Sequence, residues 1–364
     1  MRLLSKHIVG FDYLRAICCL MVVLHHSDGL RIFAFNETIS QMFSVYYMNI
    51  GLLAVPIFFQ VSLYLFYAKR QTQKDYFWKT SLPKLLLLYG FWTSLFMSVK
   101  LLIGDFSFYE RFGTVANLLA TIITAGESLF YFLFSLLLIT GLADLSLKIK
   151  AQYQIPENRW RIYETLGLII SLIYVVWAAP FTLESQQQLW AVHSNPLNFI
   201  PYIFSSYFIF QAIDRFIQKK SYNLKKEINR VVIPLAVAAI LCGAIEWQLL
   251  YRADFFADGL LPHYTRISSF FASTAIVYLV ILLPLQPNNI ITFLSRCSLG
   301  IYCFHKFLPN VLGIALDKVL TTLWGVGIQD NIPLMSSILC VNWILFSILL
   351  TVMFSKIKFL RRVL

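Results

Sequence analysis

Charged residues are scarce in this sequence of 364 residues. Aspartate, glutamate, lysine and arginine make up 13% of the chain, whereas soluble globular domains carry roughly 25%. A chain with so few charges cannot cover its surface with polar groups, which excludes an ordinary soluble fold. Hydrophobic residues reach 59%, and the mean hydropathy is +0.70. The composition therefore indicates a protein whose outer surface faces lipid.

Several signals of common soluble functions are also missing. The six cysteines lie in apolar segments without the spacing of metal ligands, so we interpret them as small buried side chains and expect no metal site. No segment resembles a nucleotide-binding loop, so any transport would be gradient-driven or passive. No internal repeat or soluble domain stands out, and a single transmembrane domain is expected over residues 1–364.

Long apolar stretches recur over the whole chain. Each has about 20 residues, the length that crosses a hydrocarbon core of ~30 Å as an α-helix. The weak alternating pattern of a membrane β-barrel is absent. The sequence therefore predicts an all-α, polytopic membrane bundle of about ten transmembrane helices, near 8–28, 44–68, 84–104, 126–147, 163–180, 197–214, 231–250, 266–286, 296–316 and 332–355.

Basic residues are distributed unequally between the two sides of these spans. Arg15 and Lys306 lie within spans, six others lie on one side, and all the rest of the 30 lysines and arginines lie on the other. The six are Arg31, Lys100, Arg111, Arg252, Arg266 and Lys318. Because basic residues accumulate on the cytoplasmic side, both termini are predicted to be cytoplasmic. The net charge of +12 then comes from basic residues in the cytoplasmic loops and does not indicate binding to nucleic acid. The partner expected instead is the lipid bilayer, and we expect a multi-pass protein of the plasma (inner) membrane.

The first span carries groups that a purely lipid-facing helix would lack. Residues 12–27 read DYLRAICCLMVVLHHS, with Asp12 and Arg15 near one end and His25 and His26 near the other. The charges interrupt the apolar run and no small-residue cleavage site follows it, so we interpret it as a retained span rather than a signal peptide. A charge at the bilayer centre costs about 3 kcal/mol or more, so these groups need compensation.

Arg15 and His26 are eleven residues apart in this span. Eleven residues return to within about 20° of the same helix face and advance about 16 Å along the axis. Both side chains are therefore expected to face one channel, with Arg15 nearer the cytoplasm and His25 turned to a different face. Asp12 lies three residues before Arg15, close enough for an ion pair.

These residue types suit a particular chemistry. Histidine can accept a proton near neutral pH, and arginine keeps its charge and binds phosphate or a developing oxyanion. Together they suit a general base and an anion-stabilising group. Simpler structural roles remain open: Arg15 can extend to the membrane interface, and His26 can make an ordinary hydrogen bond between helices.

Three motifs, in order along the chain, resemble the membrane-bound acyltransferase 3 family. FDYLRAICCLMVVLHHS is similar to the family's opening, in which ten residues separate an arginine from a histidine, here Arg15 and His26. VPIFFQVSLYLF is similar to the family's Phe-Phe-x-x-Ser-Gly segment, with Ser62 retained and Leu63 in place of the glycine. SRCSLGIYCFHKFLP, near the end, resembles the late Ser-x-Gly-Ile-Tyr-x-x-His motif.

The resemblance implies an O-acyltransferase. Such proteins take an acyl group, commonly acetyl, from cytoplasmic acetyl-coenzyme A or another acyl-coenzyme A. They place it on a sugar hydroxyl of a cell-surface polysaccharide or lipid-linked glycan, and no tightly bound cofactor is expected. His26 is the candidate general base or acyl relay. Arg15 is the candidate to hold donor phosphate or carbonyl oxygen, or to stabilise the oxyanion.

Further residues are expected to support this site. The supporting candidates are Asp12, Ser62, Tyr302 and His305, with Lys79 and Lys84 as candidate ligands of the donor phosphates at the cytoplasmic mouth. His305 is expected in the middle of the ninth span, where an ionisable group suggests a function.

Structural alternatives to these roles remain open. The two lysines can be ordinary interfacial anchors, and Ser62 can donate a hydrogen bond to the backbone of its own helix. Tyr302 and His305 can be a packing pair between helices.

Two other functions are compatible with the sequence. One is a transporter or flippase for a glycan precursor, which would move its substrate without consuming acyl-coenzyme A. The other is an assembly partner that keeps the fold without the activity. The intact spacing of Arg15 and His26 argues against the second, whereas Leu63 at the glycine position leaves it open.

Overall fold

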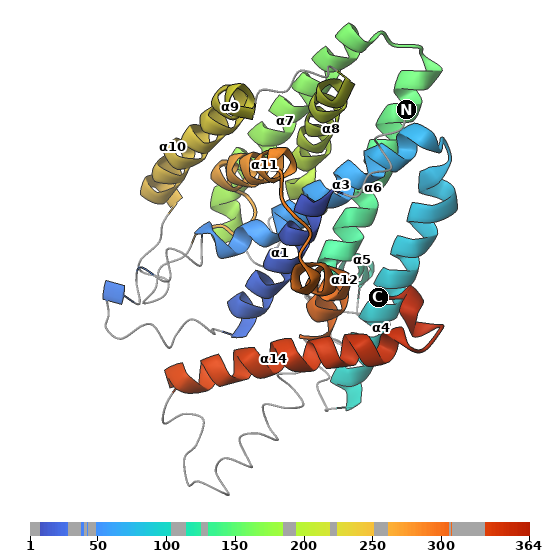
Figure 1. Cartoon of the computed structure of the whole chain (residues 1–364), viewed down its shortest axis with the longest axis vertical. Helices are drawn as coiled ribbons and strands as arrows, with labels where there is room; N and C mark the ends of the chain where they lie inside the picture. The colour runs from blue at the N-terminus through green and yellow to red at the C-terminus, as the bar shows by residue number, and fades with distance from the viewer. Residues whose placement is uncertain are drawn as a thin grey trace, which may run out of the picture. The chain divides into compact units, whose positions relative to one another are not determined.

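The computed structural model is built from helices (Figure 1). It describes residues 8–27, 38–39, 42, 49–102, 114–124, 130–184, 194–218, 224–250, 261–305, 307 and 332–364. The helices are α1 Val9–Ser27, α3 Ala54–Thr72, α4 Leu82–Leu102, α5 Val115–Thr124, α6 Tyr131–Gln152, α7 Glu157–Glu184, α8 Pro201–Gln218, α9 Leu224–Glu227, α10 Ile233–Leu250, α11 Ile267–Leu282, α12 Asn289–Phe304 and α14 Ile332–Ser355. The prediction of an all-α fold is confirmed.

Most of the predicted spans coincide with helices that can cross a membrane. Among the described residues, seven helices are long and apolar enough: Val9–Ser27, Gly51–Thr72, Phe77–Leu102, Tyr131–Gln152, Glu157–Thr182, Leu224–Leu250 and Ser337–Ser355. The shorter apolar helices α11 and α12 overlap the predicted spans 266–286 and 296–316, and α8 overlaps 197–214. The polytopic membrane bundle is therefore confirmed, and the cytoplasmic placement of the termini stays a prediction.

Two of these membrane helices begin with a π-helical turn. A π-helical turn, Phe77–Ser81, precedes α4, and another, Ile228–Val232, precedes α10. The first N–H after each turn bonds to the carbonyl of the first residue of the turn, five positions back. Pro83 and Pro234 lie two residues after these turns, and a proline ring clashes with the carbonyl four residues before it in an ordinary α-helix. The wider π turn relieves this clash and lets the chain stay helical through each proline.

The chain divides into two compact units, and the first contains most of the helices. It comprises Met1–Phe11, Val55–Thr93 and Phe106–Gln286. Its interior is rich in aromatic rings, and Phe59 of α3 lies 4.4 Å from Phe199 and 4.6 Å from Phe132 between ring centroids. The buried Gln60 donates a hydrogen bond of 2.8 Å to Ser273 of α11. The Tyr67 hydroxyl of α3 also donates to the carbonyl oxygen of Ile203 on α8 at 3.1 Å, so aromatic packing and buried polar bonds together join α3 to its neighbours.

Other helices of the first unit show how it meets lipid. α10 packs against α11, yet Ile240, Leu241 and Leu249 of α10 remain exposed. Large apolar side chains exposed along a helix are costly in water and favourable in hydrocarbon, so this face of α10 fits the membrane interior. On α7, a Cβ added at Gly167 would lie 2.5 Å from the Phe204 ring, so only glycine permits this close packing against α8.

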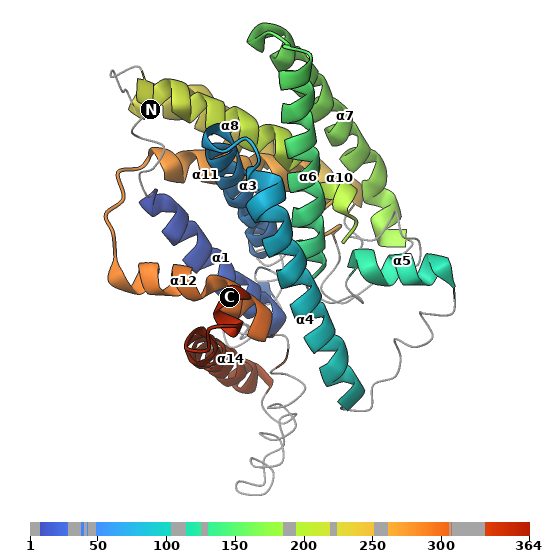
Figure 2. The ribbon, with the colours of Figure 1, turned by 90° about the vertical axis from the view of Figure 1, so that its right-hand side faces the viewer.

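The second unit contains α1 from Asp12 onward, α12 and α14. It comprises Asp12–Ala54, Ser94–Asp105 and Pro287–Leu364. α12 packs on α14, and Figures 1 and 2 show both helices near the end of the chain. A Cβ added at Gly300 of α12 would lie 2.1 Å from Oγ1 of Thr351 of α14. The glycine of the late motif therefore lets two membrane helices approach closely, as small residues do in lipid.

The ninth predicted span is displaced along the sequence. Apolar length predicts it at 296–316, whereas α12 runs from Asn289 to Phe304. Asn288 fixes the start, because its side chain accepts hydrogen bonds from the N–H groups of Ile290 and Ile291. The prediction that His305 lies in the middle of this helix is therefore wrong, since His305 follows its last residue.

Candidate active site

Arg15 and His26 lie on one uninterrupted helix, α1. The helix runs from Val9 to Ser27, so the eleven-residue separation corresponds to a rise of about 16 Å on nearly the same face. Arg15 is half-buried and His26 is exposed. The placement of both residues on one helix, which the sequence predicted, is confirmed. Their chemical roles stay predictions.

His26 lies against a second histidine from the other end of the chain. The rings of His26 and His305 are stacked, with 5.4 Å between their centroids and 28° between their planes. His305 is fully buried, and its Nδ1 lies 3.2 Å from the carbonyl oxygen of Ile301. Because a carbonyl only accepts, Nδ1 of His305 carries the hydrogen of this bond, which fixes the ring orientation. Tyr302 lies beside it, with ring centroids 6.1 Å apart.

A buried hydrogen bond also joins the first turn of α1 to the middle of α12. Oγ of Ser295 on α12 donates to Oδ1 of Asp12 on α1 at 2.8 Å, and both side chains are buried. Asp12 is also near enough to act electrostatically on the guanidinium of Arg15. Asp12 near the start of α1 contacts the middle of α12, and His26 near the end of α1 contacts His305 just after the end of α12, so the two helices run in the same direction. Parallel orientation is what the predicted topology requires of the first and ninth spans.

His25 has different surroundings from its neighbour. It is half-buried, and a Cβ added at Gly51 would lie 3.8 Å from its Nδ1. The rings of His25 and His26 meet edge to face, with centroids 5.2 Å apart and planes at 78°. His25 therefore packs beside the Gly51 turn, while His26 carries the exposed imidazole.

Three predicted site residues belong to the first unit. Ser62 is half-buried on α3, and the neighbouring Leu63 is fully buried. Lys79 is exposed on the π-helical turn before α4, where Nζ lies 3.1 Å from the carboxylate of Asp75, and Lys84 is exposed on α4. Arg15, His26, Asp12, Tyr302 and His305 all belong to the second unit.

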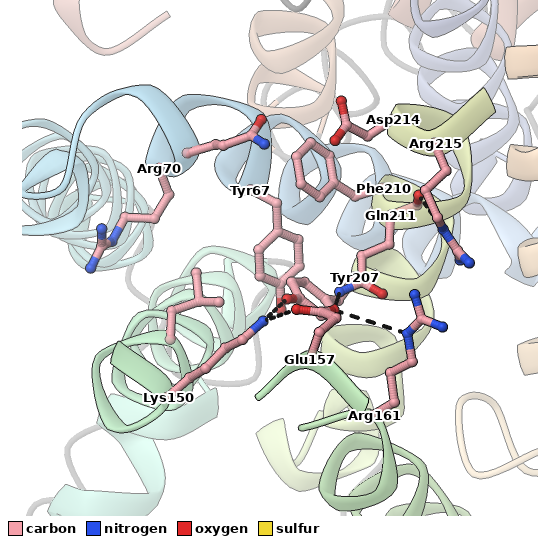
Figure 3. A pocket seen from close by; sticks show the side chains of 12 residues that line it. Tyr67, Arg70, Lys150, Glu157, Arg161, Tyr207, Phe210, Gln211, Asp214 and Arg215 are labelled. Atoms are coloured by element: carbon pink, nitrogen blue, oxygen red, sulfur yellow. Dashed lines mark hydrogen bonds and ion pairs between the residues drawn. The ribbon is translucent and has the colours of Figure 1, made fainter. Parts of the chain in front are cut away.

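The first unit contains a charged cavity that the sequence did not lead us to expect. It has a volume of about 440 Å³ and lies where the ends of α3, α6, α7 and α8 meet (Figure 3). Its charged lining residues are Arg70, Lys150, Glu157, Arg161, Asp214 and Arg215. The basic residues Arg70, Lys150 and Arg215 are in the last turns of α3, α6 and α8, whereas Glu157 is in the first turn of α7. Each of these charges complements the dipole of its own helix.

Several of these charges are held by close partners. Nε of Arg70 lies 2.6 Å from Oδ1 of the buried Asp144, and Lys148 lies 3.1 Å from the other oxygen. Nζ of Lys150 lies 2.6 Å from Glu157 and donates to the Tyr207 hydroxyl at 3.0 Å. These pairs reduce the cost of placing charges at the edge of an apolar bundle.

A second buried ion pair lies elsewhere in the first unit. Nε of Arg266 lies 3.0 Å from Oε2 of Glu246 on α10, and the arginine side chain is 1% exposed. The other oxygen of Glu246 accepts from the backbone N–H of Ser268 at 3.0 Å, at the start of α11. Glu246 therefore joins α10 to α11 and satisfies a free helix N-terminus, which is a structural use of an intramembrane charge.

The cysteines have the surroundings expected of structural residues. All six are free thiols; five are buried and Cys242 is half-buried. Within the described ranges, no group of three or more histidine, cysteine, aspartate or glutamate side chains is arranged to hold a metal ion.

The apolar spanning helices define a multi-pass membrane protein, and its second unit brings two stacked imidazoles and an arginine onto α1 and the end of α12. A sequence model of the acyltransferase domain matches residues 8–355. The chain therefore belongs to the acyltransferase 3 family and is a membrane acyltransferase. Comparison with curated proteins gives no match, and neither does comparison with solved structures.

Proposed function

We propose that this membrane acyltransferase moves an acyl group from cytoplasmic acyl-coenzyme A to a sugar hydroxyl of a cell-surface polysaccharide or lipid-linked glycan. The observation that carries the proposal is the exposed imidazole of His26, stacked on a buried and orientated His305. An imidazole that is accessible on one side and fixed on the other is suited to proton transfer with a bound substrate. Acetyl is the acyl group we expect.

The reaction that these groups would support is a direct transfer. Nε2 or Nδ1 of His26 takes the proton of the acceptor hydroxyl while the hydroxyl oxygen attacks the thioester carbonyl. The new carbon–oxygen bond forms, the carbon–sulfur bond breaks, and the coenzyme thiolate receives the proton from the imidazolium. General base catalysis of this kind contributes roughly 10²–10⁴-fold to the rate. His305 acts as a positioning residue through its contact with the His26 ring.

The length of α1 helps to choose among the possible roles of Arg15. A rise of about 16 Å between Arg15 and His26 is too long for both groups to contact one carbonyl carbon. If His26 lies at the acyl group, Arg15 lies further along the donor, toward the predicted cytoplasmic side. Its guanidinium is therefore better suited to bind the body of the coenzyme than to stabilise the oxyanion.

A transfer assay with matched histidine variants tests this function. Purified protein in lipid nanodiscs would be incubated with labelled acetyl-coenzyme A and a glycan extract, and labelled glycan would be measured. The His26→Ala variant should transfer about 10²–10⁴-fold more slowly than the wild type. His25→Ala, which changes the adjacent imidazole beside Gly51, should keep most of the activity and serves as the control.

Two outcomes would contradict the proposal in different ways. Equal transfer by wild type and His26→Ala would remove His26 from the mechanism while leaving the acyltransferase activity intact. If no acyl-coenzyme A is consumed but labelled glycan precursor moves across the membrane of proteoliposomes, the protein is the transporter of the alternative interpretation.

A further inference from the structure

The charged cavity of the first unit contains more positive charge than its own carboxylates hold closely. Arg70 and Lys150 have carboxylate partners at 2.6 Å. Arg161 approaches Glu157 only at 4.0 Å, and Nε of Arg215 donates to the backbone carbonyl of Gln211 at 3.1 Å. In the part of the chain that the structure describes, neither of these two guanidinium groups is therefore held by a close carboxylate.

Figure 3 shows how the two arginines enter the cavity. Arg161 comes from the start of α7 and Arg215 from the end of α8, and both lie on the side of the cavity opposite Arg70. The Arg161 side chain is 43% exposed, while its Nε is buried and has no hydrogen-bond partner among the described residues. Two guanidinium groups at one mouth present planar sets of N–H donors, which is the arrangement that binds phosphate groups.

The cavity also offers aromatic surface and a suitable size. The rings of Tyr67, Tyr207 and Phe210 line it, and the Tyr67 and Phe210 rings are stacked with centroids 6.2 Å apart. A volume of about 440 Å³ lies within the range of small-molecule sites, roughly 300–1,000 Å³. Aromatic side chains beside arginines suit a ligand that combines a flat base with phosphates.

The sequence places this cavity on one side of the membrane. Its four basic residues lie at the ends of the second, fourth, fifth and sixth predicted spans, and all of them face the side that we predict to be cytoplasmic. In the structure these ends do meet, since the same cavity takes residues from α3, α6, α7 and α8. A phosphorylated substrate made in the cytoplasm would reach the cavity without crossing the bilayer.

We propose that this cavity binds the phosphate-bearing nucleotide part of the acyl-coenzyme A donor through Arg161 and Arg215. The inference rests on the proposed function, because it assigns a binding site to the donor of that reaction. It differs from the sequence-based expectation, which put the donor phosphates at Lys79 and Lys84; neither lysine lines the cavity. Arg70 and Lys150, held by Asp144 and Glu157, shape the cavity wall.

Direct binding measurements test the site separately from catalysis. Coenzyme A, which carries no acyl group, would be titrated calorimetrically into protein in nanodiscs of zwitterionic phosphatidylcholine. Arg161→Gln and Arg215→Gln should each weaken binding about tenfold, and the double variant about a hundredfold, because each loses a charge-assisted phosphate contact. Arg159→Gln, two residues away on α7 and exposed outside the cavity, is the matched control and should bind as the wild type does.

Three further arms sharpen the result. Coenzyme A without its 3′-phosphate should bind more weakly to the wild type and respond less to the double variant. Arg296→Gln, which changes a basic residue in the middle of α12 that does not line the cavity, should bind coenzyme A as the wild type does. Nanodiscs with an anionic phospholipid distinguish the two sources of phosphate, since a site for the coenzyme should keep its dependence on Arg161 and Arg215 in that lipid. Size-exclusion profiles and unfolding temperatures equal to the wild type show that the variants are folded.

The outcomes separate this inference from the proposed function. If the wild type transfers acyl groups but the double variant binds coenzyme A with unchanged affinity, the cavity assignment is wrong and the function stands. If the double variant binds coenzyme A as the wild type does but binds the anionic phospholipid more weakly, the cavity is a lipid headgroup site and the assignment is again wrong. If the wild type neither binds coenzyme A nor consumes acyl-coenzyme A, both proposals fail.

Discussion

The buried carboxylate of Asp144 in the first unit lies 2.6 Å from Arg70 and 3.1 Å from Lys148, whereas that of Asp12 in the second unit accepts a 2.8 Å hydrogen bond from the uncharged Ser295. In the first case two cations compensate one anion. In the second, an uncharged hydroxyl joins two helices, and Asp12 still acts electrostatically on Arg15. The comparison shows two ways in which a buried carboxylate is stabilised, by two nearby cations in the first unit and by a hydroxyl of a neighbouring helix in the second.

The largest effect on the free energy of unfolding is expected at the buried ion pair between Arg70 and Asp144. Arg70→Met would leave the buried Asp144 with Lys148 as its remaining close partner, and breaking a buried pair costs about 3–5 kcal/mol in the free energy of unfolding. Because Lys148 remains, we expect a loss near the lower end, about 3 kcal/mol. SDS titration in mixed micelles, followed by the reactivity of the buried cysteines, would measure it.

An exposed ion pair in the same unit is the control. Lys79 and Asp75 are 77% and 64% exposed, so Lys79→Met should cost about 1 kcal/mol or less. Adding Asp144→Leu to Arg70→Met should recover most of the lost stability, since the unpaired charge is then removed. Equal effects of Arg70→Met and Lys79→Met would mean that the buried pair does not hold the first unit together.

A smaller effect, on activity, is expected at Arg15 in the second unit. If Arg15 binds the body of the donor, Arg15→Gln should raise the KM for acyl-coenzyme A about tenfold or more and have less effect on the turnover rate, because a charged hydrogen bond contributes about 1.5–3 kcal/mol. Arg15→Lys should recover part of the loss. Initial rates over a range of donor concentrations separate the two parameters.

A variant with a lower turnover rate and an unchanged KM would give Arg15 a different role. A turnover rate that falls by roughly 10²–10³-fold while the KM stays unchanged is the result expected for a group that stabilises the oxyanion. In that case α1 would have to bend in the complex, since its straight length keeps Arg15 about 16 Å of helix rise away from His26.

The sequence predicts well whatever lies within a single helix. Apolar length places the membrane helices, and the spacing of Arg15 and His26 follows from the helical repeat once α1 is one helix. It predicts less well where helices end. The start of α12 carries a recognisable cap signal in Asn288, which apolar length alone overlooks, and the helix therefore begins seven residues earlier than predicted.

Sites built from several helices were harder to foresee. The His26–His305 stack joins residues 279 positions apart, and a motif can mark both residues without showing that they touch. The charged cavity draws on four helices, and each of its basic residues looks in the sequence like an ordinary interfacial anchor. Their convergence depends on packing, which no local pattern encodes.

A last comparison of stability concerns a glycine in each unit. In the second unit, Gly300→Ala would place a Cβ 2.1 Å from Oγ1 and 2.5 Å from Cγ2 of Thr351, so α12 and α14 must separate at a cost of about 1–3 kcal/mol. In the first unit, no atom of the described residues, apart from the nearby backbone of α4 itself, lies within 4 Å of the Cβ that Gly90→Ala adds to α4. That change should be neutral or stabilise the protein by up to about 1 kcal/mol, because alanine is the better helix former.

Gly300→Ala and Gly90→Ala are expected to change the free energy of unfolding in different directions, so the two variants can be compared directly. Adding Thr351→Ala to Gly300→Ala removes the two closest atoms and leaves the Thr351 Cβ at 2.8 Å as the next one, so SDS titration should show at least half of the lost stability restored. Such a rescue would mean that the glycine of the late motif serves the contact between α12 and α14, and through α12 the position of His305 beside His26. If Gly300→Ala and Gly90→Ala behave alike, helix propensity rather than close packing determines both positions, and the late motif needs another physical explanation.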